Sequence, residues 1–139
     1  MSQFTAIKRT NPSAPMRFLH ENKLLVGRTL DYGCGRGFDA KFYSLEAYDP
    51  YWRAELPQGK FDTITCIYVL NVVDKETSAS IIEKVRLLLA PGGKAYFVVR
   101  RDLRESKKGR GCIQRSVNLS SVSIRKTSSY EIYEYAALV

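Results

Sequence analysis

The sequence has few cysteines, a single histidine and no long apolar run, and each shortage excludes a class of protein. Its three cysteines lack metal-ligand spacing, and their odd number does not suit a disulfide framework. No apolar run approaches the roughly 20 residues of a membrane-spanning helix. The N-terminal residues lack the apolar centre of a secretory signal. We therefore expect a cytoplasmic protein of 139 residues in one domain, with no metal site and no membrane contact.

Acidic residues are outnumbered, and the excess positive charge is confined to two flanks of the chain. The formal net charge is +8, with +4 in residues 1–30 and +7 in residues 100–126, whereas residues 31–99 carry −1. We expect residues 1–10 to be mobile and 101–112 to form a basic loop. Such asymmetry suggests a polyanionic partner, DNA or RNA. The alternative is a solvated basic loop that only improves solubility.

The central feature of the sequence is a glycine-rich turn between two short strands. A short apolar run that begins at residue 29 and ends at Asp31 reads as a buried strand, and residues 45–48 read as a second one. Glycine stands at every second position between them, at Gly33, Gly35 and Gly37. This is a βαβ unit with Asp49 at the end of its second strand. We expect the glycines to let backbone N–H groups approach a ligand, and Asp49 to accept both hydroxyls of a ribose.

The spacing of the glycines separates two classes of nucleotide ligand. In the dinucleotide fingerprint the third glycine stands three residues after the second, and Phe38 occupies that position here. Asp31, just before the turn, would repel a pyrophosphate but suits an ammonium group such as that of methionine. In these residues the sequence resembles the class I S-adenosylmethionine (SAM)-dependent methyltransferases, whose first motif is an acid followed by alternating glycines. A tight turn without a ligand is the alternative.

The second half of the chain predicts further strands and a helix. Residues 63–68 are continuously apolar, as in a strand that is covered on both faces. Residues 75–90 place apolar side chains at helical spacing. Pro91-Gly92-Gly93 is expected to stop this helix, and residues 94–100 then form another buried strand. The same order of helix, Pro-Gly-Gly and strand recurs in the methyltransferases, which strengthens the resemblance.

The two ends of the chain complete the expected fold. A first helix starts at Asn11 or Ser13 as its cap and ends at Gly27. Residues 113–119 and 130–135 are expected to pair as antiparallel strands. Only about ten residues separate Asp49 from the next strand, where most class I methyltransferases insert a helix, a strand and another helix. The resemblance therefore implies an α/β protein with a trimmed Rossmann-like class I methyltransferase fold, a mostly parallel sheet and a C-terminal antiparallel strand pair.

The resemblance also assigns the residues of a SAM site. The first motif would hold the methionine part of SAM, and Asp49 would hold its ribose. The residues expected to contact the cofactor are Asp31, Gly33, Cys34, Gly35, Gly37, Asp49, Pro50, Tyr51, Ile67, Tyr68 and Leu70. Tyr68 and Asn71 are the candidates for orienting the acceptor, and no catalytic base is marked. The rings of Tyr51 and Trp52 either wall an adenosine or cover a hydrophobic edge.

The closer resemblance is to small bacterial and phage-type methyltransferase-like proteins, some of which are associated with DNA modification systems. It implies methyl transfer from SAM to a nucleic acid, whose phosphates Arg100, Arg101 and Arg104 would contact. The sequence lacks the Asp/Asn-Pro-Pro-Tyr motif of base-amine methyltransferases and the Pro-Cys of cytosine-carbon methyltransferases, so those acceptor atoms lose support. The alternatives are methylation of a small molecule or a protein, and a module that binds SAM or nucleic acid without catalysis. So short a domain also suggests a homo-oligomer or a partner subunit.

Overall fold

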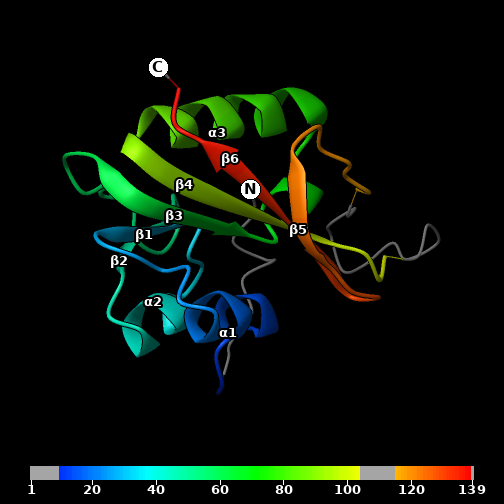
Figure 1. Cartoon of the computed structure of the whole chain (residues 1–139), viewed down its shortest axis with the longest axis horizontal. Coiled ribbons are helices and arrows are strands. Elements are labelled where there is room, and N and C mark those ends of the chain that lie inside the picture. The colour runs from blue at the N-terminus through cyan, green and yellow to red at the C-terminus, as the bar shows by residue number, and fades with distance from the viewer. Residues whose placement is uncertain (1–9, 104–114, 139) are drawn as a thin grey trace.

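A computed structural model describes residues 10–103 and 115–138 of the chain (Figure 1). Its helices are α1 (Ala14–Glu21), α2 (Phe38–Phe42) and α3 (Lys75–Leu87), with a short 3₁₀ helix, η2 (Leu70–Val72). Its strands are β1 (Thr29–Tyr32), β2 (Glu46–Tyr48), β3 (Phe61–Ile67), β4 (Leu89–Arg100), β5 (Val122–Lys126) and β6 (Tyr130–Ala136). The segment expected to be mobile and most of the expected basic loop lie outside the described residues.

The strands form one mixed sheet between two layers of helices. The strand order is β2-β1-β3-β4-β6-β5. The first four strands in this order run parallel, and β6 runs antiparallel to both β4 and β5. Helices α1 and α2 lie on one side of the sheet and α3 lies on the other (Figure 1). The expected α/β architecture, mostly parallel with antiparallel C-terminal strands, is thus confirmed.

The connection from β2 to β3 is as short as the sequence predicts. Residues 49–60 contain no helix and no named strand, only an isolated bridge between Asp49 and Arg53. The three-residue strand β2 is consequently an edge of the sheet. Aromatic side chains on either side of β2 in the chain are left open to solvent: Phe42 is 59% exposed, Tyr51 53% and Trp52 40%.

The outer strand of the antiparallel pair was predicted at the wrong place. The pairing partner of β6 at the edge is β5, not residues 113–119. Residues 115–119 form no strand, and residues 113 and 114 lie outside the described part of the chain. Val117 is buried and Leu119 packs against the core, so the apolar pattern that suggested a strand reflects the packing of an irregular segment. Strand β5 itself is largely exposed, and its only apolar residues are Val122 and Ile124.

The Pro-Gly-Gly segment does not separate a helix from a strand. Helix α3 ends at Leu87, before the predicted residue 90, and β4 already begins at Leu89, before the predicted residue 94. A Cβ atom on Gly93 would lie 2.9 Å from the carbonyl oxygen of Ala90 and 3.0 Å from that of Asp62. Glycine is therefore required there because two backbone segments approach closely, where the pairing of β3 and β4 shifts register.

Helix α1 is fixed beside the glycine turn by a buried polar contact. Ser13 donates from its backbone nitrogen and its hydroxyl to the two carboxylate oxygens of Asp39, at 2.8 and 2.6 Å. The Ser13 hydroxyl also accepts a hydrogen bond from Met16 N, so Ser13 rather than Asn11 is the N-cap. The helix ends at Glu21, well before the predicted Gly27. Within residues 10–103 and 115–138, no helix has the length and apolar character to cross a membrane.

Candidate cofactor site

The glycine turn follows β1 at the carboxyl edge of the parallel strands, where open α/β sheets bind ligands. Gly33, Gly35 and Gly37 have φ angles of +82°, +57° and +82°, a region that residues with a side chain rarely adopt. The N–H groups of Gly33 and Cys34 donate to the carbonyl oxygen of Tyr48 at 2.7 and 3.0 Å, and that of Gly37 donates to Cys34 O at 3.0 Å. The glycines are thus required by the backbone conformation, and the expected approach of these N–H groups to a ligand is not what this structure shows.

Asp49 stands at the end of β2, as predicted, and its carboxylate organises the loop around it. The side chain is only 3% exposed. One oxygen accepts from Gly35 N at 2.9 Å, and the other accepts from Tyr51 N at 2.9 Å and Trp52 N at 3.3 Å. These contacts join the glycine turn to the loop after β2. The proposed role of Asp49 as the ribose ligand stays a prediction.

A second carboxylate, Asp31, also lies near Cys34. Asp31 is 4% exposed and accepts a hydrogen bond from Thr65 Oγ1 at 3.0 Å. Burial, followed by the nearby carboxylates of Asp31 and Asp49, raises the pKa of the Cys34 thiol to about 12. The thiol is therefore protonated at neutral pH and is not a nucleophile, which favours the reading of Cys34 as a small residue in a tight turn.

The carboxyl end of β3 contains one strained residue, Tyr68. Its φ angle is +61°, and a residue other than glycine is held in this region at a cost of about 1–3 kcal/mol, typically at functional sites. The guanidinium of Arg100 lies 5.6 Å from the centre of the Tyr68 ring. Both groups therefore meet at the edge of the sheet where an acceptor would approach. Tyr68 stays a candidate for orienting it.

Two other predicted site residues are buried and do not suit the roles assigned to them. Leu70 is fully buried in the core, so its side chain is not available to the cofactor. Asn71 is 1% exposed, and its side chain donates to Arg115 O at 2.8 Å and accepts from Arg100 N at 2.7 Å. Because both ends of the amide are used within the fold, Asn71 positions the end of β4 and does not face an acceptor.

The arginines predicted to bind phosphates differ in their surroundings. Arg100 forms a paired contact with Asp102, at 2.9 and 3.0 Å, near the surface. Arg101 is largely buried, with its guanidinium 2.7 Å from Glu131 and 2.6 Å from Val117 O. Arg104 lies outside the described residues. Phosphate contacts by these arginines stay a prediction, and Arg101 would have to leave a buried ion pair to make one.

Sequence reasoning missed two arginines that lie at the glycine turn. The guanidinium of Arg36 lies 4.6 Å from the centre of the Trp52 ring. The guanidinium of Arg53 lies against Gly37, with Nε 3.3 Å from the place of a Cβ atom on that residue. Charged residues in loops are usually solvated, which is why neither attracted attention. The short connection between β2 and β3 is the signal that would have found them, because it keeps residues 50–53 close to the glycine turn.

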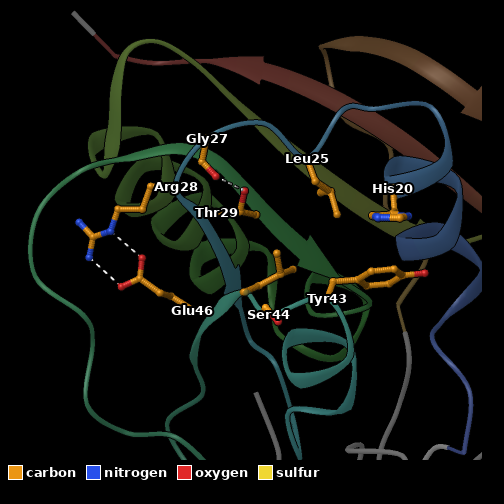
Figure 2. Close-up of a pocket in the computed structure, with 9 residues that line it drawn as sticks. His20, Leu25, Gly27, Arg28, Thr29, Tyr43, Ser44 and Glu46 are labelled. Atoms are coloured by element: carbon orange, nitrogen blue, oxygen red, sulfur yellow. Dashed lines mark hydrogen bonds and ion pairs between the residues drawn. The ribbon is translucent and has the colours of Figure 1, made fainter.

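A separate groove lies at the opposite end of the strands. It has a volume of about 360 Å³ and is lined by residues from the end of α1 to the start of β1 and from the start of β2 (Figure 2). Arg28 and Glu46 form an ion pair along one wall, and His20 stacks on Tyr43 with ring centres 4.4 Å apart. His20 therefore has a packing role, as expected for a lone histidine on a helix. Since Thr29 and Glu46 begin their strands, this groove is not the cofactor site.

The side chains around the glycine turn fit SAM. The two carboxylates suit an ammonium group and ribose hydroxyls, the arginines suit a carboxylate, and the exposed aromatic rings suit an adenine. Among the residues that the structure describes, no three His, Cys, Asp or Glu side chains are grouped as metal ligands.

The sequence profile of a family described as the methyltransferase domain matches residues 6–118. The chain belongs to this family. The match includes the glycine turn, Asp49 and the Pro-Gly-Gly segment, so the elements that carry the resemblance all lie within it. No curated protein sequence matches the chain.

Several solved structures share the fold. DhpI, solved with S-adenosylhomocysteine (SAH), has a TM-score of 0.54 and 15% identity over 87% of this chain and 86% of its own. The magnesium protoporphyrin IX methyltransferase ChlM from Synechocystis PCC 6803, also solved with SAH, has a TM-score of 0.54 and 15% identity over 87% of this chain and 79% of its own. The SAM-dependent methyltransferase SibL has a TM-score of 0.61 and 9% identity over 88% of this chain. The methyltransferase domain here spans 54% of the length of SibL.

The chain is therefore a methyltransferase domain with the Rossmann-like fold that these enzymes share, and the DhpI and ChlM structures were solved with SAH or SAM bound. Neither the family match nor these structures concern nucleic acid, DNA modification or phage proteins.

Proposed function

We propose that this domain transfers the methyl group of SAM to a nucleic acid. The observation that carries the proposal is the net charge of +7 within residues 100–126, a segment that leaves the carboxyl end of β4. The proposed cofactor residues stand at the same edge of the sheet. Lysine and arginine side chains at this edge would neutralise backbone phosphates and hold the acceptor at the mouth of the site.

The residues on the two sides of the glycine turn would hold the two ends of SAM. Asp31 would accept from the methionine ammonium group, and Asp49 would accept from the ribose hydroxyls. Tyr51 and Pro50 would lie against the adenine. SAM supplies an electrophilic methyl group on its sulfonium. The chain then needs to bind, orient and desolvate the acceptor, and correct alignment alone removes much of the barrier.

A small molecule or a protein is the second candidate acceptor. It is favoured by the arginines of the basic flank that already form contacts within the fold. Arg101 pairs with Glu131 in the interior, and Arg100 pairs with Asp102. Arg115 donates to Val73 O and Ser78 Oγ, at 3.1 and 2.7 Å. Much of the described positive charge of this flank is therefore used within the fold.

The test is the salt dependence of nucleic-acid binding in matched charge variants. In the double variant Arg100→Gln, Arg104→Gln we expect the slope of log affinity against log salt concentration to fall by about 1.8, if each arginine contacts one phosphate of duplex DNA. The control is Lys60→Gln, Lys84→Gln, which removes the same charge from exposed positions just before β3 and near the end of α3, away from the carboxyl edge of the sheet. Equal slopes in the two double variants would remove Arg100 and Arg104 from the interface.

Transfer of labelled methyl groups from SAM then separates the candidate acceptors. Labelled DNA or RNA supports the proposal. Labelling confined to small molecules or proteins, in a sample that binds SAM, contradicts it and supports the second candidate.

A further inference from the structure

We infer that Arg53 binds the α-carboxylate of the methionine part of SAM. The inference rests on the cofactor placement proposed above, with the methionine part beside the glycine turn, and it does not depend on the identity of the methyl acceptor. It assigns a ligand to the carboxylate of SAM, for which the sequence analysis named no partner.

The glycine turn itself does not supply that partner. A carboxylate needs N–H donors or a cation, and in many nucleotide sites the backbone of a glycine turn provides them. Here the N–H groups of Gly33, Cys34, Gly35 and Gly37 already donate within the fold, to Tyr48 O, Asp49 Oδ2 and Cys34 O. The two nearest acids would repel a carboxylate. These four N–H groups are therefore not available to a carboxylate, and a cationic side chain beside the turn would supply the donors.

Arg53 stands where such a cation is needed. Its Nε, Nη2 and Cζ atoms lie 3.3, 3.5 and 3.9 Å from the place of a Cβ atom on Gly37, so the guanidinium lies across the glycine. A Cβ atom at position 37 would make a tight contact with Nε, and the guanidinium would have to shift by a few tenths of an ångström. The absence of a side chain there thus makes room for Arg53, in addition to permitting the φ angle of +82°.

The loop after β2 fixes Arg53 relative to the proposed ribose ligand. The backbones of Asp49 and Arg53 exchange two hydrogen bonds, each 2.9 Å long. One tight loop therefore presents an acid for the ribose and a cation for the carboxylate. Arg53 lowers the pKa of Cys34 while Asp31 and Asp49 raise it, so the cation and both acids share one neighbourhood. The pattern of one cation beside two acids matches the charges and hydroxyls of SAM.

The guanidinium of Arg53 is also uncommitted. Its side chain is exposed at the surface, and within residues 10–103 and 115–138 it forms no hydrogen bond and no ion pair. Arg28, Arg100 and Arg101 are all paired with carboxylates. Arg36, the other arginine of the turn, lies over the ring of Trp52. The N–H groups of both turn arginines are open to a ligand, but only the Arg53 guanidinium lies against Gly37, whereas that of Arg36 faces the indole.

The experiment compares two ligands that differ only in the carboxylate. SAM and decarboxylated SAM are titrated calorimetrically into the wild type, Arg53→Gln and the matched control Arg36→Gln. We expect the wild type to prefer SAM by about 10- to 100-fold, the usual strength of a charged hydrogen-bonded pair. In Arg53→Gln the preference falls to within about threefold, because only SAM binding weakens. Arg36→Gln keeps the preference of the wild type.

A merely structural role for Arg53 gives a different result, since its loss would weaken both ligands equally and leave the preference unchanged. That outcome overturns the inference. So does a wild type without any preference, or a preference that is lost in Arg36→Gln instead. Arg53→Lys keeps the charge without the two-pronged geometry, and we expect an intermediate preference. These titrations need no acceptor, so they can fail while the proposed nucleic-acid methylation holds, or succeed while it fails.

Discussion

At the scale of single residues, Asp49 connects the stability of the loop with cofactor binding. Its buried carboxylate accepts hydrogen bonds from three backbone N–H groups and stands at the proposed ribose site. We expect Asp49→Ala to weaken SAM binding by more than about tenfold and to lower the free energy of unfolding by about 2 kcal/mol, because hydrogen bonds to a charged group are lost. Calorimetric titration and thermal unfolding measure the two effects.

Glu55→Ala is the control for this change, because it removes a carboxylate from the same loop at an exposed position. It should leave both quantities unchanged. If SAM binds Asp49→Ala as tightly as the wild type, the ribose lies elsewhere.

At the scale of elements, one buried ion pair joins the three C-terminal strands. Glu131 on β6 accepts from Arg101 after β4, at 2.7 Å, from Ser123 on β5, at 2.5 Å, and from Tyr133, at 3.1 Å. Burial alone would raise the pKa of Glu131, and the hydrogen bonds from Ser123, Arg101 and Tyr133 outweigh it, so the pKa is lowered. The ionised carboxylate therefore stabilises the fold above its unfolded-state pKa, and this stabilisation is lost as the pH falls through the lower folded-state value.

We expect Glu131→Gln to lower the free energy of unfolding by about 3 kcal/mol at pH 7, since it leaves Arg101 buried without its counter-charge. The difference from the wild type should shrink as the pH falls below about 4.3, where the carboxyl of the unfolded chain begins to protonate, and disappear below the lower pKa of the folded state. Denaturant unfolding at a series of pH values measures it. Glu134→Gln on the same strand is the control: its ion pair with Lys94 is 4.0 Å long and partly exposed, and its removal should cost under about 1 kcal/mol. A pH-independent difference for Glu131→Gln would mean that packing, not charge, holds the strands.

These elements also show what a sequence can predict. The helix at 75–90 and the buried strand at 63–68 were found because their apolar periodicity follows directly from the face that they bury. Strand β5 was missed because its two apolar residues, Val122 and Ile124, form too short an alternation to stand out, and the strand is held at the exposed edge by β6. The position of Asp49 followed from a motif, whereas its bonds to Gly35 and Trp52 depend on loop geometry that no periodicity encodes. Asn71 and Leu70 were misjudged because a strand end predicts position, not side-chain exposure.

At the scale of the whole molecule, the proposed cofactor residues come from segments that only the folded sheet brings together. The turn after β1, the loop after β2 and the end of β3 share one edge of a parallel sheet. SAM should therefore bind the folded chain and not the unfolded one. Saturation at 100 times the dissociation constant then adds about 2.7 kcal/mol to the free energy of unfolding. For a domain of this size that corresponds to a rise in Tm of roughly 10 °C.

Thermal unfolding with and without SAM tests this, and NAD at equal concentration is the control. The expected rise in Tm with SAM alone means that one chain forms the cofactor site despite its short crossover. An unchanged Tm in both would mean that the isolated chain lacks a formed site. The exposed Tyr51 and Trp52 beside the edge strand β2 would then mark where a second copy or a partner subunit completes it. In that case we expect the rise in Tm with SAM to appear only at protein concentrations at which the chain self-associates, or after the partner is added.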